Sequence, residues 1–196
     1  MHPHLRLSLL SLLLISGGCG ATVGRDLGGV PNFATVDPAP DAIYRGGQPS
    51  RAGFRTLKDM GVKTVIDLRD DAVEWEKEVV SGHGMKYVHI PSNAARTSKA
   101  TIARFLAAVA RAERPIYVHC KRGRDRTGLE IACYRLVHQR DQWTRQNVID
   151  ELRRHGQQRL FFPGIERFLL TFDPSDFVPA PAPAGAPADD TATAGG

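Results

Sequence analysis

The sequence predicts an α/β fold: a mostly parallel sheet of four to five strands, flanked by helices. Two observations support this class: apolar, strand-like runs alternate with helix-like segments through the middle of the chain, and glycine or proline separates many of them. The 196 residues, of which 42% are hydrophobic and 24% charged, suffice for one ordinary domain with a buried core. This composition excludes a wholly disordered chain, a collagen and a polytopic membrane protein.

The first half of the domain is expected to read strand, helix, strand, helix, strand. In order, the segments are Ala42–Arg45, Arg51–Met60, Lys63–Leu68, Val73–Ser81 and Met85–Ile90. β-Branched and apolar residues dominate the three strands. Ser50 can accept a hydrogen bond as the N-cap of the first helix, and Gly61 can end that helix. Pro91 stops the last of these strands.

The second half continues the alternation and then becomes helical. In order, its segments are the helix Lys99–Ala112, the strand Pro115–His119 and the helices Arg126–His138, Thr144–His155 and Ile165–Phe172. Ser98 is the expected N-cap of the first helix. In parallel sheets, ligands bind beyond the carboxyl ends of the strands. The segment that follows Pro115–His119 is therefore the expected site.

Both ends of the chain are predicted to lie outside the folded domain of residues 32–172. Residues 1–18 have the pattern of a signal peptide, since the apolar run Leu7–Ile15 is shorter than the roughly 20 residues that span a bilayer. The small residues before Cys19 resemble a bacterial lipobox, which implies export and a lipid-anchored Cys19, and ordinary cleavage near Ala21 is the alternative. Residues 19–31 read as a Gly-rich tether, and residues 173–196 as a flexible Pro/Ala-rich tail.

The segment from His119 to Gly128, HCKRGRDRTG, combines a nucleophile with groups that bind phosphate. Five residues separate Cys120, at the end of a strand, from Arg126, at the start of a helix. The intervening backbone N–H groups can form a nest for phosphate oxygens, and Gly123 permits the positive φ that such a turn needs. Arg126 can hold two phosphate oxygens at once, and an ionised Cys120 can attack phosphorus.

The neighbours of these two residues have supporting roles in this interpretation. His119 is expected to buttress the thiolate, and Thr127 to donate a hydrogen bond to the sulfur when it leaves phosphorus. Thiolate attack forms a phosphocysteine, which water then hydrolyses. The loop amides and Arg126 can neutralise the developing charge, so neither a metal ion nor another cofactor is predicted.

The loop resembles the signature His-Cys-x-x-Gly-x-x-Arg-[Ser/Thr]-Gly of the cysteine-dependent protein tyrosine and dual-specificity phosphatases, and every fixed position is met. Tyr44–Ser50 and Gly61–Arg69 are similar to the opening of bacterial, fungal and plant atypical dual-specificity phosphatases. The resemblance covers about residues 32–172. It implies the compact phosphatase cradle fold and phosphomonoesterase activity.

The general acid is the part of the mechanism that departs from this pattern. Family members usually carry an Asp some thirty residues before the Cys, and Ile90–Thr97 contains no carboxylate. Asn93 can orient a leaving group but cannot protonate it. Asp125 is the first candidate, because a similarly placed loop Asp of myotubularin-type phosphatases has been assigned this role; a brace for the loop is its alternative function. His89, Glu74 and Glu76 are remoter candidates.

The expected substrate carries more than one phosphate. Lys121, Arg122 and Arg124 place three extra cations beside Arg126, in a pattern similar to that of tensin-type phosphoinositide phosphatases and inositol-pyrophosphate phosphatases. An inositol polyphosphate or phosphoinositide is therefore favoured, with phosphotyrosine close behind. Alternatively, these cationic side chains face solvent and serve only solubility.

Two other functions are also compatible with the sequence. A catalytically idle module could use the same loop only to bind phosphorylated ligands, and a rhodanese-like sulfurtransferase also uses a loop cysteine. The net charge of +5 fits an anionic partner, but no motif for nucleic acid accompanies it, so no nucleic acid is expected. Membrane attachment is expected only through Cys19, and the oligomeric state is not predicted.

Overall fold

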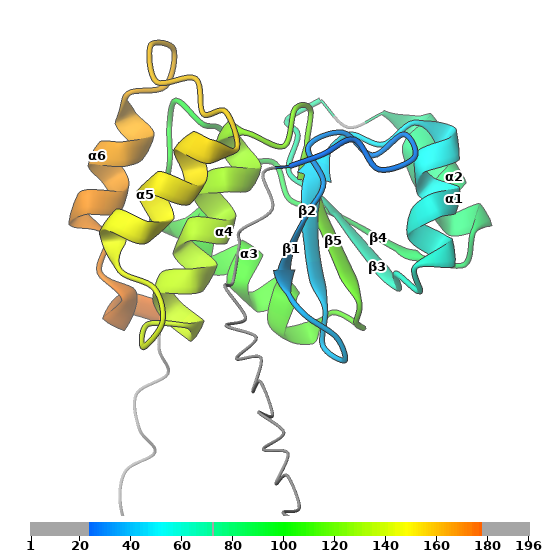
Figure 1. Ribbon diagram of the computed structural model, residues 1–196, viewed down its shortest axis with the longest axis horizontal. Helices are drawn as coiled ribbons and strands as arrows, with labels where there is room; N and C mark the ends of the chain where they lie inside the picture. The colour runs from blue at the N-terminus through cyan, green and yellow to red at the C-terminus, as the bar shows by residue number, and fades with distance from the viewer. Residues whose placement is uncertain (1–23, 72, 178–196) are drawn as a thin grey trace, which may run out of the picture.

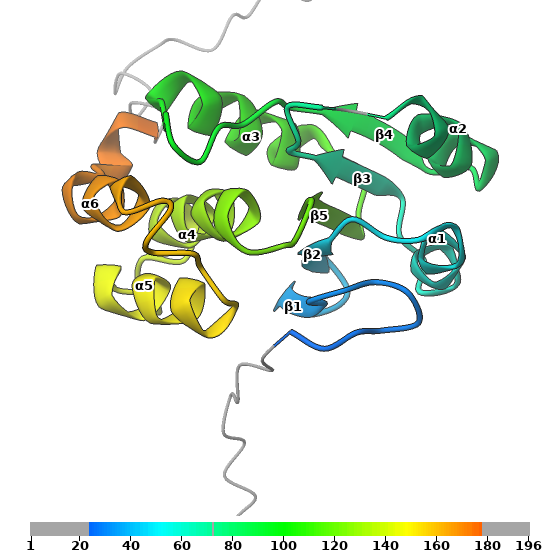
Figure 2. The same ribbon diagram turned by 90° about the horizontal axis from the view of Figure 1, so that it is seen from above.

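The computed structural model describes residues 24–71 and 73–177, which form a five-stranded sheet between layers of helices (Figures 1 and 2). The predicted fold class is confirmed. The predicted signal peptide, Cys19 and the part of the tail after Phe177 lie outside the described residues. Within them, none of the helices has the length and apolar character needed to cross a membrane.

The sheet places one strand at its centre and directs that strand's carboxyl end toward the loop of interest. The strands are β1 (Ala34–Asp37), β2 (Ile43–Gly47), β3 (Thr64–Asp67), β4 (Lys86–His89) and β5 (Ile116–Cys120), in the order β1-β2-β5-β3-β4. β2, β5, β3 and β4 run parallel, and only β1 is antiparallel to its neighbour. Cys120 lies opposite Gly47 at the end of β2. The loop after β5 therefore leaves the middle of the sheet.

Helices cover both faces of this sheet. They are α1 (Arg51–Asp59), α2 (Glu74–Gly82), α3 (Lys99–Arg111), α4 (Asp125–His138), α5 (Arg145–Arg154) and α6 (Gly164–Thr171). Figure 2 shows α1 and α2 on one face, α3 and α4 on the other, and α5 and α6 outside α4. A short 3₁₀ helix, η1 (Pro174–Phe177), follows α6.

The predicted N-caps define the starts of two helices. The hydroxyl of Ser50 accepts a hydrogen bond from the Gly53 N–H, and that of Ser98 accepts one from the Thr101 N–H. Thr144, predicted as the first residue of a helix, is instead the N-cap of α5. Short polar side chains satisfy backbone N–H groups that lack a partner within the helix, so local sequence suffices to place these ends.

Helix α4 is the centre of the larger hydrophobic core. Leu129, Cys133, Leu136 and Val137 of this helix are all buried. Most of the other residues of α4 are buried as well, because the sheet, α3, α5 and α6 enclose the helix. A helix so enclosed gives the loop at its N-terminus a rigid base.

The domain extends beyond the predicted boundary at each end. The predicted tether is incorrect for residues 24–31, since Arg25 bridges to Phe33 and Val30 is fully buried against α1 and β3 residues. The predicted tail is likewise incorrect at its start, where Phe177 of η1 stacks on Phe172 at 5.1 Å between ring centroids. In both places the packing of an apolar side chain, fully buried for Val30 and partly buried for Phe177, outweighs the Gly- or Pro-rich composition.

Candidate active site

The loop that joins β5 to α4, the signature loop (residues 120–126), has the geometry expected from the sequence. Gly123 has a φ of +68°. A Cβ atom at this position would lie 2.3 Å from the carbonyl carbon of Gly46, because the loop passes directly over the end of β2. Only glycine combines this conformation with this close approach. Helix α4 begins one residue earlier than predicted, at Asp125.

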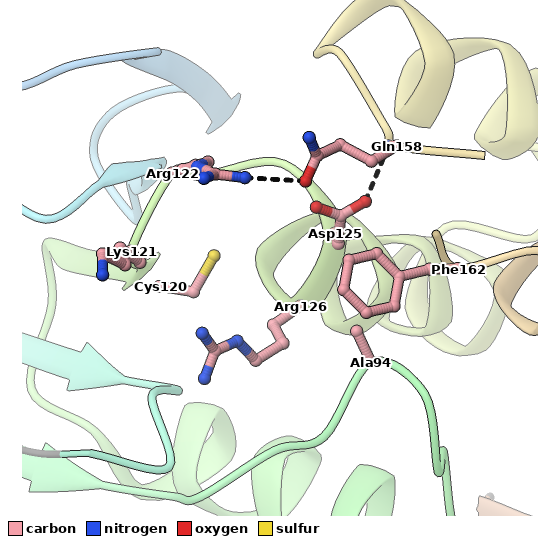
Figure 3. A pocket seen from close by; sticks show the side chains of 8 residues that line it. All are labelled: Ala94, Cys120, Lys121, Arg122, Asp125, Arg126, Gln158 and Phe162. Atoms are coloured by element: carbon pink, nitrogen blue, oxygen red, sulfur yellow. Dashed lines mark hydrogen bonds between the residues drawn. The ribbon is translucent and has the colours of Figure 1, made fainter. Parts of the chain in front are cut away.

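Cys120 and Arg126 open into the same pocket of about 200 Å³ (Figure 3). The pocket is lined by Ala94, Cys120, Lys121, Arg122, Asp125, Arg126, Gln158 and Phe162. In Figure 3 the sulfur of Cys120 points among these side chains, with the guanidinium of Arg126 beside it. Cys120 is only 3% exposed, so a ligand must reach the sulfur through this opening. A wider hollow around Leu160 and Pro163 holds no nucleophile.

Arg126 is held by the carboxylate of Asp70, which lies a few residues after β3. Its Nη1 atom donates to Asp70 Oδ1 at 2.6 Å, and Asp70 itself is largely exposed. Desolvation acts to raise the pKa of the Asp70 carboxyl, but hydrogen bonds from the backbone and from Arg126 hold it below its usual value. A bound phosphate and Asp70 would compete for the same guanidinium.

His119 lies beneath the pocket, in a buried network of ionisable groups. Its Nε2 atom is 2.8 Å from Glu76 Oε1, although the two groups do not meet hydrogen-bond geometry. Arg69 donates to Asp67 at 2.7 Å and to Glu76 at 2.8 Å. Desolvation acts to raise the pKa of the Asp67 carboxyl. The hydrogen bonds from Arg69 outweigh this effect, so the pKa lies below its usual value.

The same network is the one place among the described residues where three metal-ligating side chains, Asp67, Glu76 and His119, lie close together. Arg69 already supplies the cation that both carboxylates need, and all three ligand residues are fully buried. The network therefore fits a support for β5 and Cys120 better than a metal site. The role of His119 as a buttress of the thiolate stays a prediction.

Asp125 lines the pocket and is fixed by the connection between α5 and α6. Its Oδ1 atom accepts a hydrogen bond from the backbone N–H of Gln158 at 2.8 Å. The side-chain oxygen of Gln158 accepts a hydrogen bond from Arg122 at 2.8 Å (Figure 3). Asp125 is 8% exposed, and its carboxylate stands at the wall of the pocket rather than in solvent.

Three other predicted residues lie near the pocket without lining it. Thr127 is fully buried on α4, and its hydroxyl has no hydrogen-bond partner among the described residues. Asn93 accepts hydrogen bonds from the backbone of Ala95 and Arg96, so its side chain shapes its own turn. Arg124 is exposed, and its side chain runs past Gly156. The remoter acid candidates His89, Glu74 and Glu76 do not line the pocket either.

Sequence reasoning missed three residues of the lining: Ala94, Gln158 and Phe162. Ala94 follows Asn93, so this lining residue lies one position beyond the residue named from the sequence. Gln158 and Phe162 belong to the irregular connection between α5 and α6, which is more than thirty residues beyond the signature loop. No motif or periodicity marks them.

A thiol and a guanidinium presented by one loop, between the central strand of a parallel sheet and a buried helix, define the cysteine-dependent phosphatases of the tyrosine and dual-specificity class. Comparison with protein-family models agrees. The model described as "DSP-PTPase phosphatase fused to NAD+ Kinase" matches residues 28–161, and the chain belongs to this family. The recognition made from the signature loop is confirmed.

Curated relatives include dual specificity protein phosphatase TpbA of Pseudomonas aeruginosa, which is 33% identical over 117 residues. That match covers 58% of this chain and 51% of TpbA, so the chain spans about half the length of this relative. Inositol diphosphatase DSP4 of Arabidopsis thaliana is 26% identical over 163 residues, or 76% of each chain.

Solved structures share the fold. The core catalytic domain of the PP-IP phosphatase SIW14 from S. cerevisiae matches with a TM-score of 0.65 at 24% identity, over 76% of this chain and 89% of that one. A cysteine-to-serine variant of P. aeruginosa TpbA in complex with pTyr matches with a TM-score of 0.60 at 25% identity. That match covers 74% of this chain and 92% of the TpbA chain.

Proposed function

We propose that the protein is a metal-independent phosphomonoesterase that forms a phosphocysteine on Cys120. The observation that carries this proposal is the shared pocket, in which the sulfur of Cys120 and the guanidinium of Arg126 face the same space. The family to which the chain belongs supports the same activity. The proposal assigns Cys120 as nucleophile and Arg126 as the group that binds the phosphoryl oxygens.

The proposed reaction has two steps. In the first, the thiolate of Cys120 forms a bond to phosphorus while the ester P–O bond breaks, and the leaving oxygen takes a proton from Asp125. In the second, water attacks the phosphocysteine and gives its proton to Asp125, the S–P bond breaks, and inorganic phosphate and the thiolate result. The Thr127 hydroxyl, which has no partner among the described residues, is available to donate to the departing sulfur. Arg126 and the loop amides stabilise both transition states.

The proposed substrates are phosphotyrosine or a polyphosphorylated inositol. Lys121 and Arg122 line the pocket beside Cys120 and can contact a second phosphate, whereas the exposed Arg124 does not line it. The names of the relatives support both classes, since DSP4 is an inositol diphosphatase and TpbA has been crystallised with pTyr. Export and a lipid anchor at Cys19 are also part of the proposal, and they rest on the sequence of residues 1–19 alone.

A turnover screen tests the proposal. The full chain is assayed in EDTA with an aryl phosphate, a phosphotyrosine peptide, a phosphoserine peptide, an inositol polyphosphate, an inositol pyrophosphate and a phosphoinositide. We expect vanadate-sensitive phosphate release, with the largest kcat/KM on a substrate that presents two neighbouring phosphates. Loss of activity in EDTA contradicts the metal-independent mechanism. Binding of vanadate without turnover of any substrate identifies the idle phosphate-binding module instead.

Replacement of Asp125 by asparagine tests the proposed acid. An alkyl leaving group needs a proton, whereas a nitrophenolate departs without one, so Asp125→Asn should lower kcat on an alkyl phosphate about 10²-fold or more and on nitrophenyl phosphate much less. Steady-state kinetics on the two substrates measure this ratio. Equal losses on both substrates would show that Asp125 braces the loop through Gln158 and does not protonate the leaving group.

A further inference from the structure

Three successive carbonyl groups of the signature loop are held by donors from the N-terminal part of the chain. The Gln48 N–H donates to Lys121 O at 3.3 Å. The side-chain amide of Asn32 lies 3.3 Å from Arg122 O and 3.0 Å from Gly123 O. Nη2 of Arg45 donates to Gly123 O at 3.0 Å. All three donors come from residues 32–48.

These contacts determine which way the loop's amides point. In a trans peptide the C=O of one residue and the N–H of the next point in opposite directions. A carbonyl fixed toward the N-terminal donors therefore turns the following N–H away from them. These N–H groups belong to Arg122, Gly123 and Arg124 and form part of the predicted phosphate nest. The N-terminal donors outside the loop thus orient the backbone N–H groups that face the inside of the loop.

Arg45 is unusual among these outer donors because it is a cation with no exposed surface. Its Nε and Nη1 atoms have no hydrogen-bond partner among the described residues. Desolvation lowers the pKa of the Arg45 guanidinium to about 10. The negative charge of Glu151 opposes this effect most strongly, and a negative charge on Cys120 also opposes it. A buried cation with unsatisfied donors destabilises a protein. The position of Arg45 directly under the loop therefore points to a functional role for this residue.

Other charged and titratable groups also surround the loop and Cys120. On β5 and in the loop they are Tyr117, His119, Lys121, Arg122 and Arg124; on α4, Asp125, Arg126 and Arg135; on α5 and after it, Glu151 and His155; around His119, Asp67, Arg69 and Glu76. Glu151 is already bound by Arg135 through two hydrogen bonds of 2.8 Å. Desolvation and the nearby Arg45 lower the pKa of His155 to about 3, so His155 adds no positive charge.

We propose that Arg45 is a positioning residue of the reaction: it holds the Gly123 carbonyl so that the loop's amides face the phosphate. This inference rests on the proposed function. Asn32 shares this task as a neutral group. Its φ of +52° and its contact with His155, whose Nδ1 lies 3.1 Å from Asn32 Oδ1, keep the amide under the loop.

The test measures vanadate binding to the full chain and does not require turnover. In Arg45→Met we expect vanadate affinity to fall by about tenfold, because the Gly123 carbonyl loses one of its two side-chain donors. Arg45→Lys keeps the charge without the planar fork, so its vanadate affinity should fall as well.

Two further variants separate the loop contacts from the charge of Arg45 and from stability. Asn32→Leu removes neutral contacts to the same loop carbonyl groups, so vanadate affinity should fall. Val109→Ala makes a cavity near the far end of α3 and should lower the melting temperature without changing vanadate affinity. An unchanged vanadate affinity in folded Arg45→Met overturns the proposal. If Arg45→Met does not fold, an unchanged affinity in both Arg45→Lys and Asn32→Leu overturns it. The expected losses of vanadate affinity, with no turnover of any substrate by the wild type, would contradict the proposed function alone.

Discussion

Replacing Cys120 by serine should abolish turnover and leave ligand binding intact. The proposed reaction needs an ionised nucleophile, and a serine hydroxyl in the same place stays protonated near neutral pH. We expect kcat to fall by at least about 10⁴-fold. The pocket keeps Arg126 and the loop amides, so a phosphotyrosine peptide or inositol phosphate should still bind to Cys120→Ser. Phosphate release and equilibrium binding, measured on the same preparation, check both halves of this result.

Cys133 provides the matched control for this experiment. It is fully buried in the core on α4, and desolvation raises the pKa of its thiol well above the usual value. Cys133→Ser places a hydroxyl in an apolar site, so it should lower stability while kcat stays within a few-fold of the wild type. Activity that survives in Cys120→Ser, or that disappears equally in both variants, would exclude Cys120 as the nucleophile.

Replacing Gly123 by alanine should remove most activity without removing any functional group. Two separate effects act here: φ is +68°, which costs an alanine about 1–2 kcal/mol, and the added Cβ would lie 2.3 Å from the Gly46 carbonyl carbon. The Gly46 carbonyl is part of the backbone of β2, which is fixed in the sheet. The signature loop must therefore move to relieve the contact. A shift of about 1 Å in the amides should lower kcat/KM by about 10²- to 10³-fold. Steady-state kinetics and vanadate binding would both report this shift.

Gly82→Ala is the comparison for this effect. Gly82 ends α2, and a Cβ added there meets no atom within 4 Å. Alanine also suits a helix better than glycine. This variant should therefore keep full activity and have an unchanged or slightly higher melting temperature. Full activity in Gly123→Ala would show that the loop tolerates displacement and that its amides do not bind the phosphoryl group.

Local signals in the sequence were sufficient for most of the fold. The β-branched run Thr64–Asp67 and the caps Ser50 and Ser98 act through their immediate neighbours, and the observed elements begin or end within two residues of the predicted ones. β1 was missed because a four-residue edge strand with little apolar character depends on its pairing with β2. The burial of most of α4 was also missed, since the sheet and three other helices determine it.

The candidate site divides in the same way. The signature loop is a contiguous motif, so Cys120, Arg126 and the turn at Gly123 could be assigned from the sequence. Gln158 and Phe162 reach the pocket from a distant connection, and no local pattern identifies such residues. Arg45 reads as an ordinary residue of a strand, and its burial under the loop follows only from the packing of β2 against β5 and α4.

The ties between the signature loop and the N-terminal part of the chain bear on how the protein folds. They join residues that are 78 to 91 positions apart, as in Arg45 with Gly123 and Asn32 with both Arg122 and Gly123. Contacts between such distant positions form slowly, because a large loop of chain must close first. During synthesis residues 32–48 emerge from the ribosome before Cys120, whereas Gln158 and Phe162, which line its pocket, emerge after it. The pocket is therefore incomplete when the reactive thiol first emerges. Newly made chains should pass through a stage in which the cysteine is accessible to oxidants and phosphate is not yet bound.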